Sequence, residues 1–110
     1  MRRKMQSRTI RFRFVFLLFW LSGLILGESQ LIAQMISTGN NHTLIIKSDG
    51  SLWAMGRNNY GKLGDGTTTT SYTPIEIESG GVVSASAGEN HSLYVKKDGS
   101  LWAMGRNNYG

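Results

Sequence analysis

The chain has 110 residues, enough for one ordinary domain, and it contains no cysteine, which excludes disulfides, thiol catalysis and cysteine-ligated zinc. Its net charge of +5 lies entirely in residues 1–33, which hold six basic residues and one acidic residue, whereas residues 34–110 hold six of each. Because the basic residues precede an apolar run and do not line a folded face, the high isoelectric point does not indicate nucleic-acid binding.

The first predicted element is the apolar run from Phe14 to Leu26, broken only by Ser22 and Gly23. A basic stretch followed by such a run is typical of a secretory signal peptide. We therefore predict a helical signal peptide over residues 1–33, with cleavage after Ala33 favoured over cleavage after Gly27. The run is shorter than the roughly 20 apolar residues that span a bilayer. Contact with a membrane is expected only through this leader during export, and an uncleaved anchor is the alternative.

A repeat with an offset of 49 residues organises the rest of the chain. The segment Asp49–Gly61 recurs unchanged as Asp98–Gly110, and identities upstream bring the total to 19 of 26 aligned positions. This pattern predicts a first repeat over residues 34–81 and a second, truncated repeat over residues 82–110. Because repeat arrays need about three or more units for stability, we expect an N-terminal fragment of a longer chain with further repeats. Assembly of several short chains is the alternative.

Short apolar runs within each repeat predict strands. The Asp49-Gly50 and Asp98-Gly99 pairs each separate two such runs, which predicts a hairpin with a type I′ turn. Residues 34–110 contain 12 glycines and no apolar run of ten residues, so helices are excluded. The predicted fold is all-β, with tandem four-stranded antiparallel blades of a β-propeller, incomplete in this chain. The strands are expected at residues 34–37, 42–47, 52–55, 74–77, 82–87, 93–95 and 101–104.

Three segments that follow one another, Gly39–Leu44, Asp49–Gly56 and Asn59–Thr67, resemble the repeat of the regulator of chromosome condensation family. The resemblance covers residues 35–110 and implies a seven-bladed propeller used mostly as a protein-binding scaffold. The founding member exchanges guanine nucleotides on a small nuclear GTPase and binds chromatin, and exported bacterial relatives include a β-lactamase inhibitor protein. The predicted leader favours the exported type over the exchange factor.

Several repeated residues are expected to be structural. His42 and His91, the only two histidines, are predicted to make hydrogen bonds at strand starts, because a zinc site needs three or four converging ligands. Trp53 and Trp102 are predicted to pack between blades. The full set of structural repeat residues is Gly39, His42, Asp49, Gly50, Trp53, Gly56, Gly61, Gly88, His91, Asp98, Gly99, Trp102, Gly105 and Gly110.

One stretch also matches a chemical motif in part. Residues 56–62 fit the first seven positions of a phosphate-binding P-loop, but Leu63 stands where Ser or Thr is required and no helix can follow. We therefore predict a structural turn there, and another at Asp65. No catalytic residue, metal ligand or cofactor is predicted.

The function expected from the sequence is that of an exported, non-catalytic scaffold, whether secreted, periplasmic or on the cell surface, that binds a protein partner of unknown identity. The connection over residues 62–73 is the candidate binding loop, since loops on a rigid scaffold usually carry binding. A carbohydrate-binding or adhesion protein that uses Tyr60 and Tyr109 is the first alternative, and nucleotide exchange on a GTPase is the second. The candidate binding residues are Tyr60, Lys62, Asp65, Thr67 and Tyr72.

Overall fold

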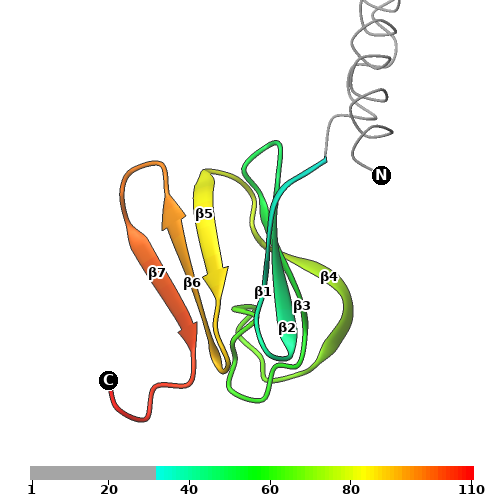
Figure 1. Ribbon diagram of the computed structural model, residues 1–110, viewed down its shortest axis with the longest axis vertical. Helices are drawn as coiled ribbons and strands as arrows, with labels where there is room; N and C mark the ends of the chain where they lie inside the picture. The colour runs from blue at the N-terminus through cyan, green and yellow to red at the C-terminus, as the bar shows by residue number, and fades with distance from the viewer. Residues whose placement is uncertain (1–31) are drawn as a thin grey trace, which may run out of the picture. The chain divides into compact units, whose positions relative to one another are not determined.

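The computed structural model describes residues 32–110, which form seven strands in two antiparallel sheets (Figure 1). The first sheet has the strand order β1-β2-β3-β4 and the second has the order β5-β6-β7. No helix occurs within residues 32–110, and all seven predicted strands are confirmed. The predicted leader lies outside the described residues except for its last two. The strands are β1 (Ala33–Thr38), β2 (His42–Lys47), β3 (Leu52–Gly56), β4 (Ser71–Glu78), β5 (Val82–Ala87), β6 (His91–Lys96) and β7 (Leu101–Gly105).

The Asp-Gly pairs form the predicted hairpins, but the predicted turn type is wrong. The amide of Gly50 donates to the carbonyl of Lys47 at 2.9 Å, and the amide of Lys47 donates to the carbonyl of Ser51 at 3.0 Å. Gly50 has a φ of 80°, and no described residue other than glycine has a positive φ. A type I′ turn needs positive φ at both central residues, so Asp49 excludes it. The geometry is that of a three-residue hairpin loop that ends on a left-handed glycine.

One face of the first sheet packs against the second sheet, with β1 and β2 lying on β5. Side chains alternate along a strand, so β2 and β3 turn Leu44, Leu52 and Ala54 toward this interface, where each is at most 1% exposed. Tyr94 reaches the same core from β6. The fold is therefore held by apolar packing between the two sheets. The core comprises Leu44, Ile46, Leu52, Ala54, Leu63, Val82, Ala85 and Tyr94.

The outer faces of the two sheets stay open within residues 32–110. The exposed fraction of Leu101 is 67%, whereas that of Leu52, its equivalent in the first repeat, is 0%. Both leucines begin an identical Leu-Trp-Ala-Met-Gly strand. The same sequence is thus buried once and exposed once, because the second sheet covers the first and no described element covers the second.

Candidate functional site

The connection between β3 and β4 is organised by a buried amide, that of Asn58, whose exposed fraction is 0%. Its side-chain nitrogen donates to the carbonyls of Thr67 at 3.0 Å and Thr69 at 3.1 Å. Its side-chain oxygen accepts from the amide of Leu63 at 2.9 Å. One side chain therefore joins both arms of the connection over residues 57–70. Asn58 is not among the residues predicted from the sequence, although its recurrence as Asn107 inside the repeated segment was a usable signal.

The predicted turn at Asp65 is confirmed. Its carboxylate accepts hydrogen bonds from the hydroxyl of Thr67 at 2.8 Å and from the amide of Thr67 at 3.0 Å. The bonds from Thr67 lower the pKa of Asp65, because they stabilise the charged carboxylate. The side-chain nitrogen of Asn58 also donates to this carboxylate, at 3.2 Å. Asp65 thus closes a turn with all its strong contacts inside the loop.

Four of the five candidate binding residues are exposed to solvent: Tyr60, Asp65, Thr67 and Tyr72. The exposed fraction of Tyr72, which lies at the start of β4, is 92%, and that of Tyr60 is 45%. The guanidinium carbon of Arg106, from the second repeat, lies 5.3 Å from the centre of the Tyr60 ring. We call these four exposed residues the loop surface. It combines two tyrosines with polar groups.

The fifth residue, Lys62, was wrongly predicted to face solvent. Its side chain is 1% exposed, and its ammonium group donates to the carbonyl of Glu89 in the second repeat at 3.5 Å. The reason is a sharp bend in which the amide of Gly64 donates to the carbonyl of Gly61, at 3.1 Å. This bend turns Lys62 and Leu63 inward between the sheets. Burial lowers the pKa of Lys62, and the nearby charge of Arg57 lowers it further.

His42, the first residue of β2, makes a hydrogen bond that joins the two sheets. Its Nε2 lies 2.7 Å from Oγ of Ser92 in β6, and that hydroxyl donates to the carbonyl of Lys62 at 2.7 Å. Since the hydroxyl proton goes to Lys62, Nε2 carries the donated proton, and in the neutral ring Nδ1 is therefore unprotonated. Nδ1 is buried without a hydrogen-bond partner. Burial lowers the pKa of His42, with smaller contributions from Lys62 and His91.

The second histidine differs from the first in its surroundings. His91 is exposed and makes no side-chain hydrogen bond within residues 32–110. It occupies the same place at the start of its strand, β6, as His42 does in β2. The predicted structural hydrogen bond is therefore found at His42, where a second sheet is present.

Trp102 lies at the rim of the sheet interface and is not enclosed by it, which corrects the prediction for this residue. Trp53 lies on the other face of the first sheet, where no described element tests the prediction. Trp102 stacks on Tyr94 with ring centres 6.1 Å apart and an interplanar angle of 8°, yet it is 48% exposed. Its indole donates to the hydroxyl of Ser100 at 2.9 Å. Trp53 is half-buried on the open face of the first sheet, with the ammonium of Lys47 3.6 Å from its ring centre. Each indole is thus held by groups of its own sheet, and the short aliphatic side chains fill the core.

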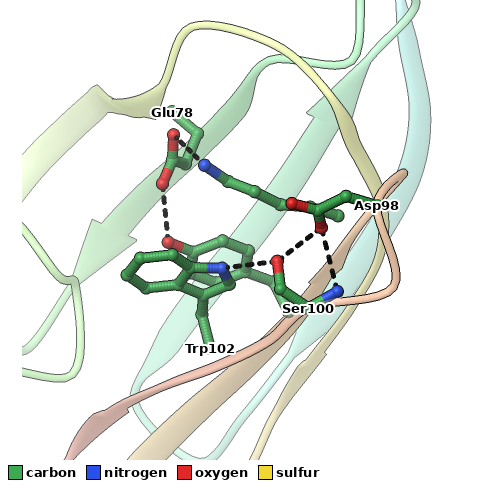
Figure 2. A network of polar contacts seen from close by, with 6 residues as sticks. Glu78, Asp98, Ser100 and Trp102 are labelled. Carbon is green, nitrogen blue, oxygen red and sulfur yellow. Dashed lines mark hydrogen bonds and ion pairs between the residues drawn. The ribbon is translucent and has the colours of Figure 1, made fainter.

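A polar network fixes this rim (Figure 2). The hydroxyl of Tyr94 donates to one oxygen of Glu78 at 2.7 Å, and the ammonium of Lys96 lies 3.1 Å from the other oxygen. Ser100, the partner of Trp102, donates its hydroxyl to Asp98 at 2.6 Å. The bond from Tyr94 is the main cause of the lowered pKa of Glu78. Glu78 ends β4 of the first sheet, so the network ties the first sheet to the second.

Within residues 32–110, no three His, Asp or Glu side chains lie where they could share a metal ion. The P-loop-like stretch forms a turn in which the amide of Gly61 donates to the carbonyl of Asn58, with no helix after it, and Lys62 contacts a backbone carbonyl. Within the same range, no helix is long and apolar enough to cross a membrane. What the arrangement provides is a fixed loop with exposed side chains.

Two antiparallel sheets, stacked face to face and built from one tandem repeat, define the class of the protein: it consists of β-propeller blades. Two family models described as the regulator of chromosome condensation (RCC1) repeat match the chain, one over residues 49–95 and the other over residues 33–62 and 82–110. The chain belongs to the regulator of chromosome condensation repeat family.

Solved structures show the same fold. Human WBSCR16 is 22% identical over 78% of this chain, with a TM-score of 0.63. Prp20p from Saccharomyces cerevisiae, in a structure reported with its binding properties to Gsp1p and histones, is 30% identical over 69% of this chain, with a TM-score of 0.55. The crystal structure of Kap60 bound to yeast RCC1 (Prp20) matches at 24% identity over 74% of this chain, with a TM-score of 0.60. The matches cover 22%, 19% and 21% of those chains, so this chain spans about a fifth of their length.

Proposed function

We propose that the chain is part of an exported, non-catalytic propeller scaffold that binds a protein partner through the loop surface. The observation that carries the proposal is the connection over residues 57–70: Asn58 holds it from within, while Tyr60 and Tyr72 point their rings outward. Binding sites are commonly loops positioned by a rigid scaffold. A loop that is already ordered loses little conformational entropy when a partner binds.

The chemistry of the loop surface suits a protein partner. Tyrosine is enriched among the residues that dominate binding energy at protein interfaces, because it offers a large apolar ring and a hydroxyl. Asp65 and Thr67 add polar groups beside the two rings. Two of the solved relatives support this class of partner, since Prp20p is described with Gsp1p and histones and yeast RCC1 with Kap60. Those partners belong to those proteins, and the partner of this chain is defined only as a protein.

The two alternatives have less support. A sugar-binding platform needs an open aromatic face, but Arg106 lies over the ring of Tyr60. Tyr109, which is 97% exposed, is then the remaining ring of the two that the sequence suggested. Nucleotide exchange on a GTPase rests on the family resemblance, and the predicted leader would remove the protein from any cytosolic GTPase.

Site-specific photocrosslinking tests the proposal in the producing cells. A probe at Thr67 is expected to give a covalent adduct with one defined protein, and Tyr72→Ala should lower its yield by about tenfold or more, as expected for loss of 1.4 kcal/mol or more. A probe at Lys97, in the hairpin at the opposite end of the sheets, is the matched control. An equal yield of the same adduct from both positions would refute binding through the loop surface. The same cells test export. Protein that is found in the cytosol and still begins at Met1 would contradict it.

A further inference from the structure

Two hydrogen bonds in series connect the buried ring of His42 to the connection that carries the loop surface. Nε2 of His42 lies 2.7 Å from Oγ of Ser92, and this hydroxyl donates to the carbonyl of Lys62 at 2.7 Å. Lys62 lies in the sharp bend over residues 61–64, which we call the inner bend. His42 therefore helps to hold the inner bend closed, through bonds that do not involve Asn58.

The ring of His42 is placed to hold one proton and not a second. In the neutral ring Nε2 carries the proton, so a second proton goes to Nδ1. Nδ1 is buried and makes no hydrogen bond within residues 32–110. A Cβ added to Gly39 would lie 2.9 Å from Nδ1 and would collide with the carbonyl of Gly88, so backbone closes the space beside this atom. A proton on Nδ1 is therefore a buried charge without a partner, which is costly.

The charged groups around the ring also oppose a second proton. Burial is the main cause of the lowered pKa of His42, and Lys62 and His91 lower it further. Arg57 and Glu89 are the charged groups that act on Lys62 in turn. Glu89 is exposed and meets Lys62 through its backbone carbonyl, and β3 and the turn before β2 carry no charged residue. A protonated His42 would thus share a buried site with the ammonium of Lys62.

The inner bend is the part of this contact that can give way. It begins at Gly61 and ends at Gly64, with φ of 75° and 82°, and glycine changes its backbone conformation at little steric cost. The ammonium of Lys62 is held by a bond of 3.5 Å to a carbonyl, which is long for a hydrogen bond. The sheets themselves are held by a separate apolar core. Outward movement of the bend would bring the Lys62 charge into water and leave that core intact.

We propose that His42 is an acid-sensitive latch: a proton taken up from solvent at Nδ1 drives Lys62 out of the contact and opens the inner bend, while the two sheets stay packed. The loop surface is built on the same connection, so opening the bend would disturb the arrangement that binds the protein partner. Acid would then release the partner. This consequence rests on the proposed function, whereas the latch itself does not.

Amide hydrogen exchange of the purified chain, followed by NMR, tests the latch without a partner. The amide of Gly64 donates to the carbonyl of Gly61 across the bend, at 3.1 Å. Its protection, measured against the intrinsic exchange rate at each pH, is expected to fall about tenfold or more between pH about 7.5 and pH about 5. The amides that pair β2 with β3 are the internal control and should keep their protection.

Variants separate His42 from the other groups that titrate. His42→Gln is neutral at every pH and keeps a side-chain amide that can donate to Ser92, so the protection of the Gly64 amide should no longer depend on pH. His91→Gln is the matched control, because His91 has the same place in the second repeat but is exposed, and it should respond like the wild type. If His42→Gln is unfolded, Lys62→Met takes its place. It removes the charge that is driven out, so the response should be much smaller than in the wild type.

Three results would overturn the latch. The first is a Gly64 amide whose protection stays constant while the ring of His42 titrates. The second is a parallel loss of protection in the β2–β3 pairing, since the sheets would then separate as a whole. The third is a pH response that persists in His42→Gln.

Partner release is measured separately, by photocrosslinking from Thr67 at both pH values. The adduct yield is expected to fall in acid along with the protection of the bend. An equal yield at both pH values, with the bend open in acid, would refute release. The absence of any adduct at either pH would refute the proposed function and leave the latch in place.

Discussion

Leu52→Ala is expected to lower the free energy of unfolding by about 2–5 kcal/mol, the range found when a buried leucine is truncated. Leu52 is 0% exposed and lies in the core between the two sheets. The substitution removes apolar contacts and leaves a cavity in this core, where the paired strands limit relaxation. Since single small domains are stable by only about 5–15 kcal/mol, this is a large share of the total. Urea unfolding followed by tryptophan fluorescence measures it.

The repeat itself provides the matched control. Leu101→Ala is the same substitution in the same local sequence, but Leu101 is 67% exposed. Its effect should stay within about 0.5 kcal/mol, as for most surface substitutions. Equal losses for the two variants would show that the first sheet is not buried under the second.

Asn58→Ala is expected to cost about 2–3 kcal/mol and to loosen the loop surface. The truncated side chain leaves the amide of Leu63 and the carbonyls of Thr67 and Thr69 without their partner. A buried polar group left unpaired costs about 1–3 kcal/mol, and part of that cost is recovered when the loop opens to water. Urea unfolding gives the free-energy change, and limited proteolysis between residues 57 and 70 reports the opening.

Asn107→Ala is the control for the loop prediction. Asn107 has the same neighbours in sequence as Asn58, but it is exposed. Its substitution should change neither stability beyond about 0.5 kcal/mol nor the rate of cleavage. A loop that remains protected from protease in Asn58→Ala would contradict the role assigned to this amide.

The strands could be predicted from sequence because local signals agreed with one another. The exact repeat fixed the period, and the apolar runs between Asp-Gly pairs fixed the strand positions. The turn type could not be predicted, because an Asp-Gly pair occurs both in two-residue type I′ loops and in three-residue loops that end on a left-handed glycine. Here the loop takes in Ser48, and only Gly50 adopts positive φ. The choice depends on where the strand pairing ends, which the pattern of residues does not show.

The candidate site was predicted less well, since it depends on contacts between repeats. Lys62 stands in a glycine-rich segment that is typical of an exposed loop, yet it is buried because the bend between Gly61 and Gly64 directs it toward Glu89. Trp102 was predicted to be enclosed, but the interface is filled by shorter side chains and its ring lies at the rim. The exposure of Tyr72 could be predicted, because its placement needs only the strand and the loop before it.

Acid should weaken the contact between the sheets through His42. Burial lowers its pKa in the folded chain, whereas the unfolded chain keeps the ordinary value of 6.5. The unfolded chain therefore binds more protons in this range, so stability rises with pH. The contribution of His42 to the free energy of unfolding is fully present above about pH 6.5. It is lost as the pH falls through the pKa of His42 in the folded chain.

The most direct test of the stacked-sheet account is an NMR titration of the His42 ring in the folded chain. Two residues of the second repeat bury the ring. Ser92 makes a hydrogen bond with it, and the carbonyl of Gly88 lies against Gly39, three residues before His42. The account predicts a midpoint below 6.5, with the proton of the neutral ring on Nε2. A midpoint at or above 6.5 would show that the ring is open to water and that the two repeats do not pack face to face.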